Sequence, residues 1–374
     1  MYIEQAHKSL SEGWRYIIGF LIIFIIGWQI IGAIPIIIGA YIKSGSLLEM
    51  LGAAENNFTT LFEGQSNLLL VLMLFTFIGG LIALIAVVKY LHKQKFVKLV
   101  TAREKTDWSR VFFAFVLWGV FSVITTLIAY YLSPEDLLWN FNLWPFLGLL
   151  AISLLLLPLQ TSFEEFLFRG YLMQGIGVNI EKDKRIGIFI VLLTIFPFVF
   201  LGIHLLFDYS GLITLGIALI ITSILYPIIN FLKADVLKKK WVPLVFTSVI
   251  FGMMHAFNPE IAKLGYSVLS VYIGLGFFLG VITLMDDGME LALGFHAANN
   301  MIIALLVTSD WTALQTNSIF LDVSEPSAIG QIIPIFIILP ILTFVFAKKY
   351  KWTNWKQKLT GSVTLPTADD QFED

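Results

Sequence analysis

The chain has 374 residues, of which 58% are hydrophobic and only 13% are charged, and its mean hydropathy is +0.85. A water-soluble core does not need so many apolar residues, so many of them must face lipid, which excludes a soluble protein. The formal net charge of −2 says little by itself, and we expect membrane lipids and no nucleic acid among the partners. Cysteine is absent, which excludes a disulfide framework, a thiolate nucleophile and a thiolate metal site.

Apolar runs of about the length that a helix needs to cross a bilayer recur along the whole chain. They lie at 15–42, 67–90, 111–132, 143–169, 187–207, 212–232, 242–257, 265–285, 289–308 and 329–347. We therefore predict an all-α fold, a polytopic transmembrane helical bundle of about ten spans. The first run is too long for a signal-peptide core, so we interpret it as a retained anchor.

Lysine and arginine gather in the segments after the second, fourth, sixth and tenth runs, whereas the alternate segments are mostly acidic. Basic segments of this kind face the cytoplasm. An even number of spans then places both termini in the cytoplasm, and we expect an integral protein of a bacterial plasma membrane. The polar end of the chain, TADDQFED, is expected to be disordered.

The fourth apolar run contains the stretch TSFEEFLFRG, with the charged residues Glu164, Glu165 and Arg169. A charge at the centre of a span costs about 2.5–3.5 kcal/mol on insertion scales, so these residues need partners or a task. Glu165 and Arg169 are four residues apart with the acid first, the favourable order for an ion pair on a helix. Glu164 is turned about 100° away and has no obvious local partner. Alternatively, the helix ends here and leaves all three in the headgroup region.

Two later runs carry polar residues at comparable depth. His255 lies about twelve residues into the run that starts at Pro243, and His296 lies about seven residues into the ninth run. Asn300 follows His296 by one helical turn on the same face. Two histidines, a carboxylate and an amide at one depth indicate a functional site inside the membrane.

The remaining histidines receive simpler interpretations. His204, near the end of the fifth run, is interpreted as a packed, hydrogen-bonding residue. His7 and His92 fall in polar segments outside the spans, where we expect water around them. The glycines of the eighth run, Gly274, Gly276 and Gly280, are interpreted as a surface for close helix packing.

Three motifs in these runs resemble those of a known family. They are EExxxR at Glu164, Glu165 and Arg169, FxxxH at Phe251 and His255, and HxxxN at His296 and Asn300. In this order, each in an apolar run, they resemble the CAAX protease and bacteriocin-processing (Abi) family of intramembrane proteases. The stretch GLGFFLGVITLMDDGMELALGFHAANN is also similar to the family's approach to its third motif.

The resemblance covers about 143–308 and implies a division of the chain. We expect an N-terminal three-span region at 1–142, a catalytic core at 143–308, a loop with the last span at 309–348, and a cytoplasmic tail at 349–374. The family usually has less chain between its first and second motifs. We therefore expect an inserted helical hairpin at about 187–232, which crosses twice and preserves the topology.

Peptide hydrolysis needs an activated water, a base for its proton and donors for the developing oxyanion. Glu164 is the candidate base, and His255 could orient the water or share its proton. His296 and Asn300 could present donors to the oxyanion, and the Glu165–Arg169 pair would hold the helix. The resemblance implies the same assignment.

A zinc ion is the open question about cofactors. Glu164, His255 and His296 would make a sensible three-ligand zinc site with an open position, and Glu165 could then serve as the base. The chain has no HExxH motif. Members of the resembled family are often called metalloproteases, yet a glutamate-activated water without metal is equally compatible with these residues.

We therefore predict an intramembrane endopeptidase that acts on a membrane-associated or lipidated protein or peptide. The alternatives are a non-proteolytic membrane scaffold, a bacteriocin self-immunity protein or a proton-coupled transporter, since intramembrane carboxylates and histidines also form proton pathways. No repeated half or pair of broken spans of the transporter kind is evident. The residues name neither the substrate nor the oligomeric state.

Overall fold

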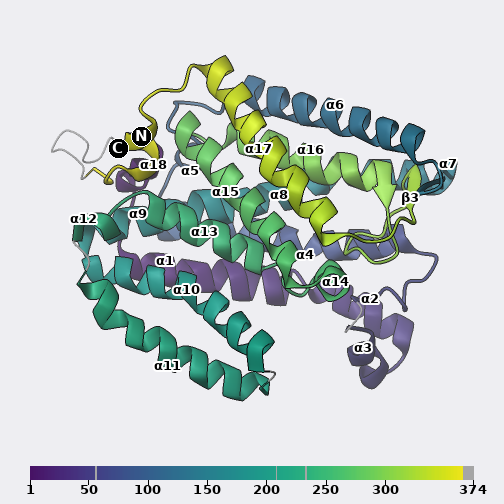
Figure 1. Ribbon diagram of the computed structural model, residues 1–374, viewed down its shortest axis with the longest axis horizontal. Helices are drawn as coiled ribbons and strands as arrows, with labels where there is room; N and C mark the ends of the chain where they lie inside the picture. Colours follow the sequence, from purple (N-terminus) through teal and green to yellow (C-terminus); the bar gives the residue numbers. More distant parts are fainter. Residues whose placement is uncertain (55–56, 208, 232–233, 365–374) are drawn as a thin grey trace.

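The computed structural model describes residues 1–54, 57–207, 209–231 and 234–364. The polar end TADDQFED lies outside these residues. Helices make up most of the described chain, which confirms the predicted all-α polytopic bundle (Figure 1). The N-terminus and α18 (Trp355–Thr360), near the C-terminal end of the described chain, lie at one end of the bundle, and β3 (Phe320–Asp322) lies at the other end. Cytoplasmic termini stay a prediction.

All ten predicted runs are apolar helices in the described chain. Eight are long enough to span a membrane: Gly13–Ser44, Ser66–Leu91, Trp108–Leu132, Leu143–Lys182, Lys184–Phe207, Gly211–Asn230, Tyr266–Asp286 and Ala328–Tyr350. The other two are shorter: α13 (Trp241–Met253) and α16 (Glu290–Leu306). Phe251 of the second motif lies on α13 and the third motif lies on α16, and both Phe251 and His296 are buried in the bundle rather than exposed to lipid.

The first three spans are built from several helical pieces. They are η1 (Ile3–Lys8), α1 (Gly13–Leu21), η2 (Ile22–Ile31), α2 (Ile34–Ser44), α3 (Leu47–Ala54), α4 (Ser66–Ala86), η3 (Val87–Leu91), α5 (Phe96–Val100) and α6 (Trp108–Leu132). The short η1 is buried, because the Tyr2 hydroxyl donates hydrogen bonds to the carbonyls of Leu99 (2.6 Å) and Arg169 (3.2 Å). The start of the chain is therefore part of the packed core.

The fourth span is broken and then unwound. It consists of α7 (Leu143–Leu155), α8 (Leu157–Glu165), η4 (Phe166–Leu172) and α9 (Met173–Lys182). Pro158 has no N–H to continue the ladder of α7, so the helix breaks at Leu156 and restarts. The segment η4 is π-helical. Such wider turns are frequent at functional sites, and this one follows Glu164 and Glu165 directly.

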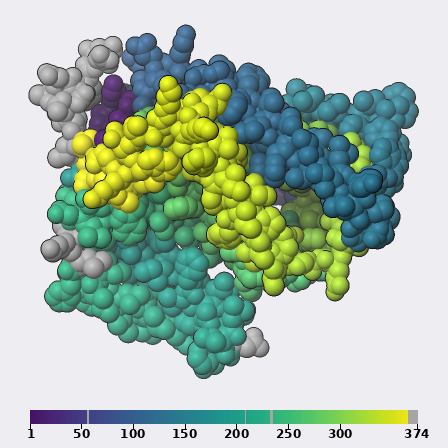
Figure 2. Space-filling view, turned by 45° about the horizontal axis from the view of Figure 1, so that its top comes forward, coloured from purple at the N-terminus to yellow at the C-terminus, as the bar shows by residue number. Residues whose placement is uncertain are grey.

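The rest of the chain completes the bundle. Its helices are α10 (Lys184–Phe207), α11 (Gly211–Asn230), α12 (Ala234–Leu237), α13, α14 (Pro259–Leu264), η5 (Tyr266–Val268), α15 (Leu269–Asp286), α16, α17 (Ala328–Tyr350) and α18 (Trp355–Thr360). The hairpin of α10 and α11 lies at the margin of the molecule, and α11 packs mainly on α10. Figure 2 shows α17 crossing the surface beside α6.

Glycines let α13 and α15 pack closely, as predicted for Gly276 and Gly280. A Cβ on Gly276 would lie 2.9 Å from the carbonyl oxygen of Ser248, and a Cβ on Gly280 would collide with Leu244. Gly252 makes the reciprocal approach to Ile273. Small residues of this kind allow helix backbones to meet without a side chain between them. This close packing brings the second motif toward the first.

A small sheet that the sequence did not indicate lies at the end opposite the termini. Its strands β1 (Leu137–Trp139), β3 (Phe320–Asp322) and β2 (Val307–Thr308) are adjacent in that order. β1 is antiparallel to β3, and β2 is parallel to it. Because β2 continues directly from α16, the sheet ties the end of the third-motif helix to the loop before α17.

Candidate active site

The first motif is buried inside the bundle. Glu164 is 7% exposed, and Glu165 and Arg169 are 0% exposed. The predicted ion pair forms, with Arg169 Nη1 3.1 Å from Glu165 Oε1. Arg169 Nη2 donates to the carbonyl oxygen of Gly276 (3.1 Å), and the guanidinium lies 4.3 Å from the ring centre of Phe251. Arg169 therefore connects η4 to both α13 and α15.

His296 on α16 joins the two glutamates, a contact that the sequence did not reveal. Its Nδ1 lies 2.7 Å from Glu165 Oε1, and its Nε2 lies 3.4 Å from Glu164 Oε2. Glu164, which has no basic partner on its own helix, thus pairs with a histidine on another helix. The first and third motifs form one cluster.

The cluster has more negative than positive charge unless it holds an extra proton. Two carboxylates face one guanidinium, and no further cation pairs with either glutamate among the described residues. A neutral imidazole has a single N–H and cannot donate to both carboxylates. A net charge is costly in a buried site, so electroneutrality favours one more proton, held between Glu164 and His296.

His255 lies just beyond the end of α13, rather than within a helical span as predicted. The helix ends at Met253, and residues 254–257 form a turn. His255 Nδ1 faces the carbonyl oxygen of Phe251 (2.9 Å), and its ring stacks on Tyr272 at 4.2 Å. The ring centre of Phe251 lies 5.2 Å from that of His255 and 5.9 Å from that of His296. Phe251 therefore packs near both histidines.

Asn300 belongs to a chain of side-chain hydrogen bonds that leads to Gln160. Trp118 Nε1 donates to Asn299 Oδ1 (3.1 Å), Asn299 Nδ2 donates to Asn300 Oδ1 (3.1 Å), and Asn300 Nδ2 donates to Gln160 Oε1 (3.0 Å). Because the oxygen of Gln160 is occupied, its amide nitrogen remains for Glu164, with which Gln160 interacts. The amides orient the carboxylate.

Gln160 was missed by the sequence analysis. It is buried and lies one helical turn before Glu164 on α8. A polar residue inside an apolar run, four residues before Glu164 and so on the same helix face, is the sequence signal that could have identified Gln160. Asn299 was also missed, because its neighbour Asn300 already completed the motif.

The described residues do not assemble the three-ligand zinc site considered above. They contain no group of three His, Cys, Asp or Glu side chains placed to hold a metal ion. Both ring nitrogens of His296 face carboxylates, so neither is free to bind a metal ion in this geometry. The donor set does not fit a zinc ion in this geometry.

Two other histidines, His92 and His204, differ from their interpretations. His92 is wrong as a water-exposed residue: it is 1% exposed, with Nδ1 2.8 Å from Leu10 O and Nε2 2.9 Å from the Tyr171 hydroxyl. It is buried because η1 and α1 pack over the segment after η3. His204 Nδ1 is buried without a hydrogen-bond partner among the described residues, so its predicted hydrogen bond is absent there.

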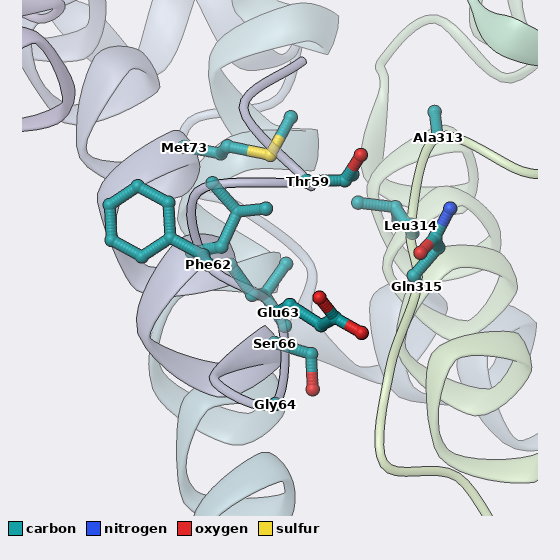
Figure 3. A pocket seen from close by; sticks show the side chains of 11 residues that line it. Thr59, Phe62, Glu63, Gly64, Ser66, Met73, Ala313, Leu314 and Gln315 are labelled. Carbon is teal, nitrogen blue, oxygen red and sulfur yellow. The ribbon is translucent and has the colours of Figure 1, made fainter. Parts of the chain in front are cut away.

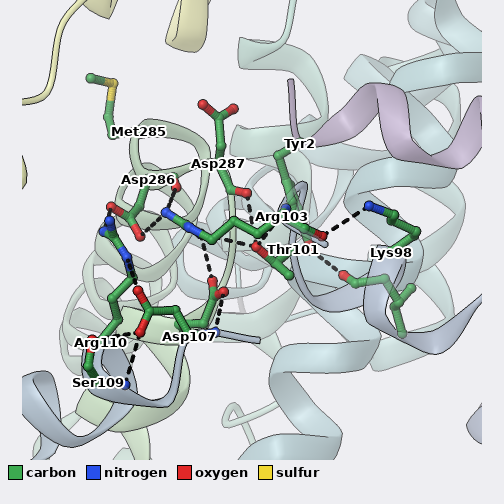
Figure 4. A network of polar contacts seen from close by, with 12 residues as sticks. Tyr2, Lys98, Thr101, Arg103, Asp107, Ser109, Arg110, Met285, Asp286 and Asp287 are labelled. Atoms are coloured by element: carbon green, nitrogen blue, oxygen red, sulfur yellow. Dashed lines mark hydrogen bonds and ion pairs between the residues drawn. The ribbon is translucent and has the colours of Figure 1, made fainter. Parts of the chain in front are cut away.

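A second polar cluster, which we call the terminal network, lies at the end of the bundle near the termini (Figure 4). Arg103 pairs with Asp286 (3.1 Å) and Glu290 (3.1 Å), and Arg110 pairs with Asp286 (2.5 Å) and Asp107 (3.0 Å). These contacts join the segment before α6 to the turn between α15 and α16. That turn is the MDDG stretch of the sequence.

The fold and the buried cluster define a class: an integral, multi-pass membrane protein with a carboxylate–imidazole site inside its helical bundle. Residues 228–302 match the family described as type II CAAX prenyl endopeptidase Rce1-like. The match contains the FxxxH and HxxxN motifs and confirms the resemblance to this family of CAAX proteases. It supports an intramembrane endopeptidase activity in general terms.

One curated relative is the Bacillus subtilis (strain 168) protein YyaK, described as uncharacterized. It is 25% identical over 302 residues, which cover 79% of this chain and 78% of the relative. A bacterial relative of this length supports the expected location in a bacterial plasma membrane. No solved structure matches the chain.

Proposed function

We propose that the chain is an intramembrane endopeptidase that hydrolyses a peptide bond of a membrane-associated or lipidated protein or peptide with a water activated by Glu164. The family match supports the general activity. The observation that carries the finer assignment is the position of Glu164, a buried carboxylate that pairs with His296 while Arg169 pairs with its neighbour Glu165. Glu165 and Arg169 hold the site, and Glu164 is free to exchange a proton.

The reaction requires Glu164 to be ionised when the water binds. The carboxylate takes a proton from the water as the water oxygen bonds to the peptide carbonyl carbon. The tetrahedral intermediate then collapses, the carbon–nitrogen bond breaks, and the proton passes from Glu164 to the leaving amine. During this step the extra proton of the cluster rests on His296, 3.4 Å from Glu164, which leaves Glu164 ionised and able to accept the proton of the water. The electroneutral resting state becomes reactive when that proton rests on the imidazole.

The donors to the oxyanion differ from those expected from the motif alone. Both nitrogens of His296 face carboxylates in this geometry, so that side chain serves the proton transfer instead. Asn300 lines a cavity and uses its amide nitrogen to contact Gln160, so its second N–H is the donor that we assign to the oxyanion. His255, with Nδ1 held by a carbonyl, presents Nε2 as a site for the water.

Replacement of Glu164 by glutamine tests the proposal. Glu164→Gln keeps the size of the side chain but cannot abstract a proton, and general-base assistance is commonly worth about 10²–10⁴-fold. We expect cleavage to fall by this factor while expression and thermal stability persist. The measurement is quantitative proteomics of membranes from cells that make the wild-type or variant chain, with substrate fragments as the readout.

Glu63→Gln is the matched control, since Glu63 is an exposed carboxylate in another part of the chain. It should leave the fragments unchanged. Full biological activity of Glu164→Gln would contradict proteolysis through this carboxylate and would favour the scaffold or self-immunity alternative.

Removal of metal tests the water-activation step independently. Since the described histidines and glutamates do not assemble a zinc site, we expect the purified protein to keep its cleavage activity after dialysis against a chelator. Metal content should be measured on the same sample. Loss of activity that added zinc restores would contradict the metal-free mechanism.

A further inference from the structure

A cavity of about 250 Å³ adjoins the proposed oxyanion donor and opens toward the small sheet. Its wall includes Asn299 and Asn300 on α16, Thr308 on β2 and Asp322 on β3. It therefore lies at the end of the bundle opposite the termini (Figure 1). An engineered cavity of about 150 Å³ admits benzene, so about 250 Å³ is enough for one long side chain.

The wall of this cavity is acidic. Glu260 and Asp322 contribute carboxylates, and no lysine or arginine is among the described residues that line it. Trp311, also in the wall, offers an aromatic surface that attracts cations. The cavity thus favours a positively charged occupant over a neutral or negative one.

Glu260 is the feature that points to a ligand. The residue is 9% exposed, and its Oε1 accepts a hydrogen bond from the backbone N–H of Ala313 (3.1 Å). Its Oε2 is buried with no hydrogen-bond partner, and Glu260 forms no ion pair with any described residue. A buried carboxylate oxygen without a partner is costly, and a cation would satisfy it.

Glu260 is also connected to the proposed active site. The Tyr272 side chain interacts with this carboxylate, and the ring of Tyr272 stacks on His255. Burial raises the pKa of the Glu260 carboxyl, which is the expected response of a carboxylate without a cationic partner. Asn300 reaches the same cavity from the other side.

We propose that this cavity binds a lysine or arginine side chain of the substrate, next to the bond that is cleaved, with Glu260 as the residue that selects it. This inference rests on the proposed peptide hydrolysis. Asp322 adds a weaker attraction at the mouth of the cavity, because it is only half-buried and already accepts a hydrogen bond from the Ser324 N–H (2.9 Å).

The test is a binding measurement that does not depend on cleavage. The full chain with Glu164→Gln, in detergent micelles, is titrated with a labelled, capped hexapeptide that carries one central lysine, and with the same peptide carrying norleucine or glutamate. A charge-assisted contact predicts that the lysine peptide binds about tenfold or more tightly than the norleucine peptide, and that the glutamate peptide binds weakest. Fluorescence anisotropy provides the dissociation constants.

Glu260→Gln, added to Glu164→Gln, should bring the lysine-to-norleucine ratio to about one while norleucine binding persists. Asp322→Asn should reduce the ratio by a smaller factor and keeps the test decisive if Glu260→Gln unfolds. The control is Glu63→Gln, whose carboxylate lines the neighbouring cavity of Figure 3 and should leave the ratio unchanged.

The outcomes separate the two proposals. A lysine-to-norleucine ratio near one in the Glu164→Gln chain would overturn the basic-residue site. So would a ratio that the added Glu260→Gln does not reduce. Cleavage that depends on Glu164 but shows no preference for lysine would leave the proposed function intact and reject this inference. A lysine preference without any cleavage by the wild-type chain would retain the binding site and reject the protease.

Discussion

The intramembrane cluster and the terminal network are both groups of acidic and basic residues, yet they differ in how deeply those residues are buried. In the intramembrane cluster, Glu164 and Glu165 share one arginine, and His296 lies between them. In the terminal network, Arg103 and Arg110 meet Asp107, Asp286 and Glu290, and both arginines and Asp107 are partly exposed. Each set has one more carboxylate than arginine, but only the terminal network is partly open to water, which screens its charges.

The two clusters also differ in how completely their acceptors are satisfied. Asp286 receives contacts from Arg103, Arg110 and the indole N–H of Trp352. In the intramembrane cluster, Glu165 Oε2 is buried without a hydrogen-bond partner among the described residues. A fully satisfied network stabilises a fold, while an unsatisfied one keeps a proton mobile at the cost of stability. We therefore infer that the terminal network stabilises the fold and that the intramembrane cluster takes part in the proposed reaction.

The largest expected effect is the loss of Arg169. Arg169→Gln leaves the fully buried Glu165 without its arginine and with only His296 as a partner, and breaking a buried pair typically costs about 3–5 kcal/mol. Expression or thermal stability in detergent should therefore fall together with activity, unlike in Glu164→Gln. Glu165→Gln should behave similarly, since it leaves the arginine unpaired.

The measurement is the unfolding midpoint of the purified variants, followed by tryptophan fluorescence. An Arg169→Gln protein with wild-type stability and no activity would contradict a purely structural role for Arg169. It would show that Arg169 takes part in the reaction.

A smaller effect is expected in the terminal network. Asp286→Asn keeps the shape of the side chain but removes the charge that Arg103 and Arg110 share. Both arginines keep other partners, Glu290 and Asp107, so we expect a loss of about 1–3 kcal/mol rather than unfolding. Cleavage per folded molecule should stay at the wild-type level. A stable Asp286→Asn protein without activity would show that the network takes part in the reaction.

The smallest effect concerns His92, a buried imidazole without a carboxylate partner, in contrast to His296. Burial lowers the pKa of His92, so the folded protein keeps it neutral. The unfolded chain takes up a proton near a pH of about 6.5, and stability therefore falls as the pH drops through and below that value. His92→Gln cannot titrate, and its unfolding midpoint should fall less between about pH 7.5 and about pH 5.5.

Parallel thermal scans of the wild-type and His92→Gln proteins at both pH values measure this difference. The variant should be less stable at the higher pH because it loses part of the contacts to Leu10 and Tyr171. An identical pH dependence in the two proteins would show that His92 is not a titrating group in this range.

Much of the architecture was predictable because the hydrocarbon of the bilayer requires apolar side chains along each spanning segment. A spanning helix needs a long apolar run, and all ten predicted runs are helices. The same demand made Glu164, Glu165 and Arg169 conspicuous, and the Glu165–Arg169 pair followed from their spacing. The close packing at Gly276 and Gly280 was readable for a related reason, since small residues gather where helices meet.

Contacts between distant segments could not be read in this way. Arg103 and Arg110 signalled orientation by their charge, but their partner Asp286 lies more than 170 residues away in the chain. The burial of His92 depends on Leu10 and Tyr171, which come from two other segments. Neither the break before Pro158 nor the π-helical η4 was predicted from the sequence, which indicated one continuous span.

The sequence alone therefore determined that the chain lies in lipid, where its spans fall, and which charged residues within the spans require partners. These follow because the transfer of a side chain into lipid depends on that side chain and its immediate neighbours. Only the tertiary structure decided which charges meet. His296 was placed between Glu164 and Glu165, and Gln160 beside Glu164, by the packing of α16 on α8. That packing is a property of two helix surfaces together, so the residues of one apolar run do not reveal it.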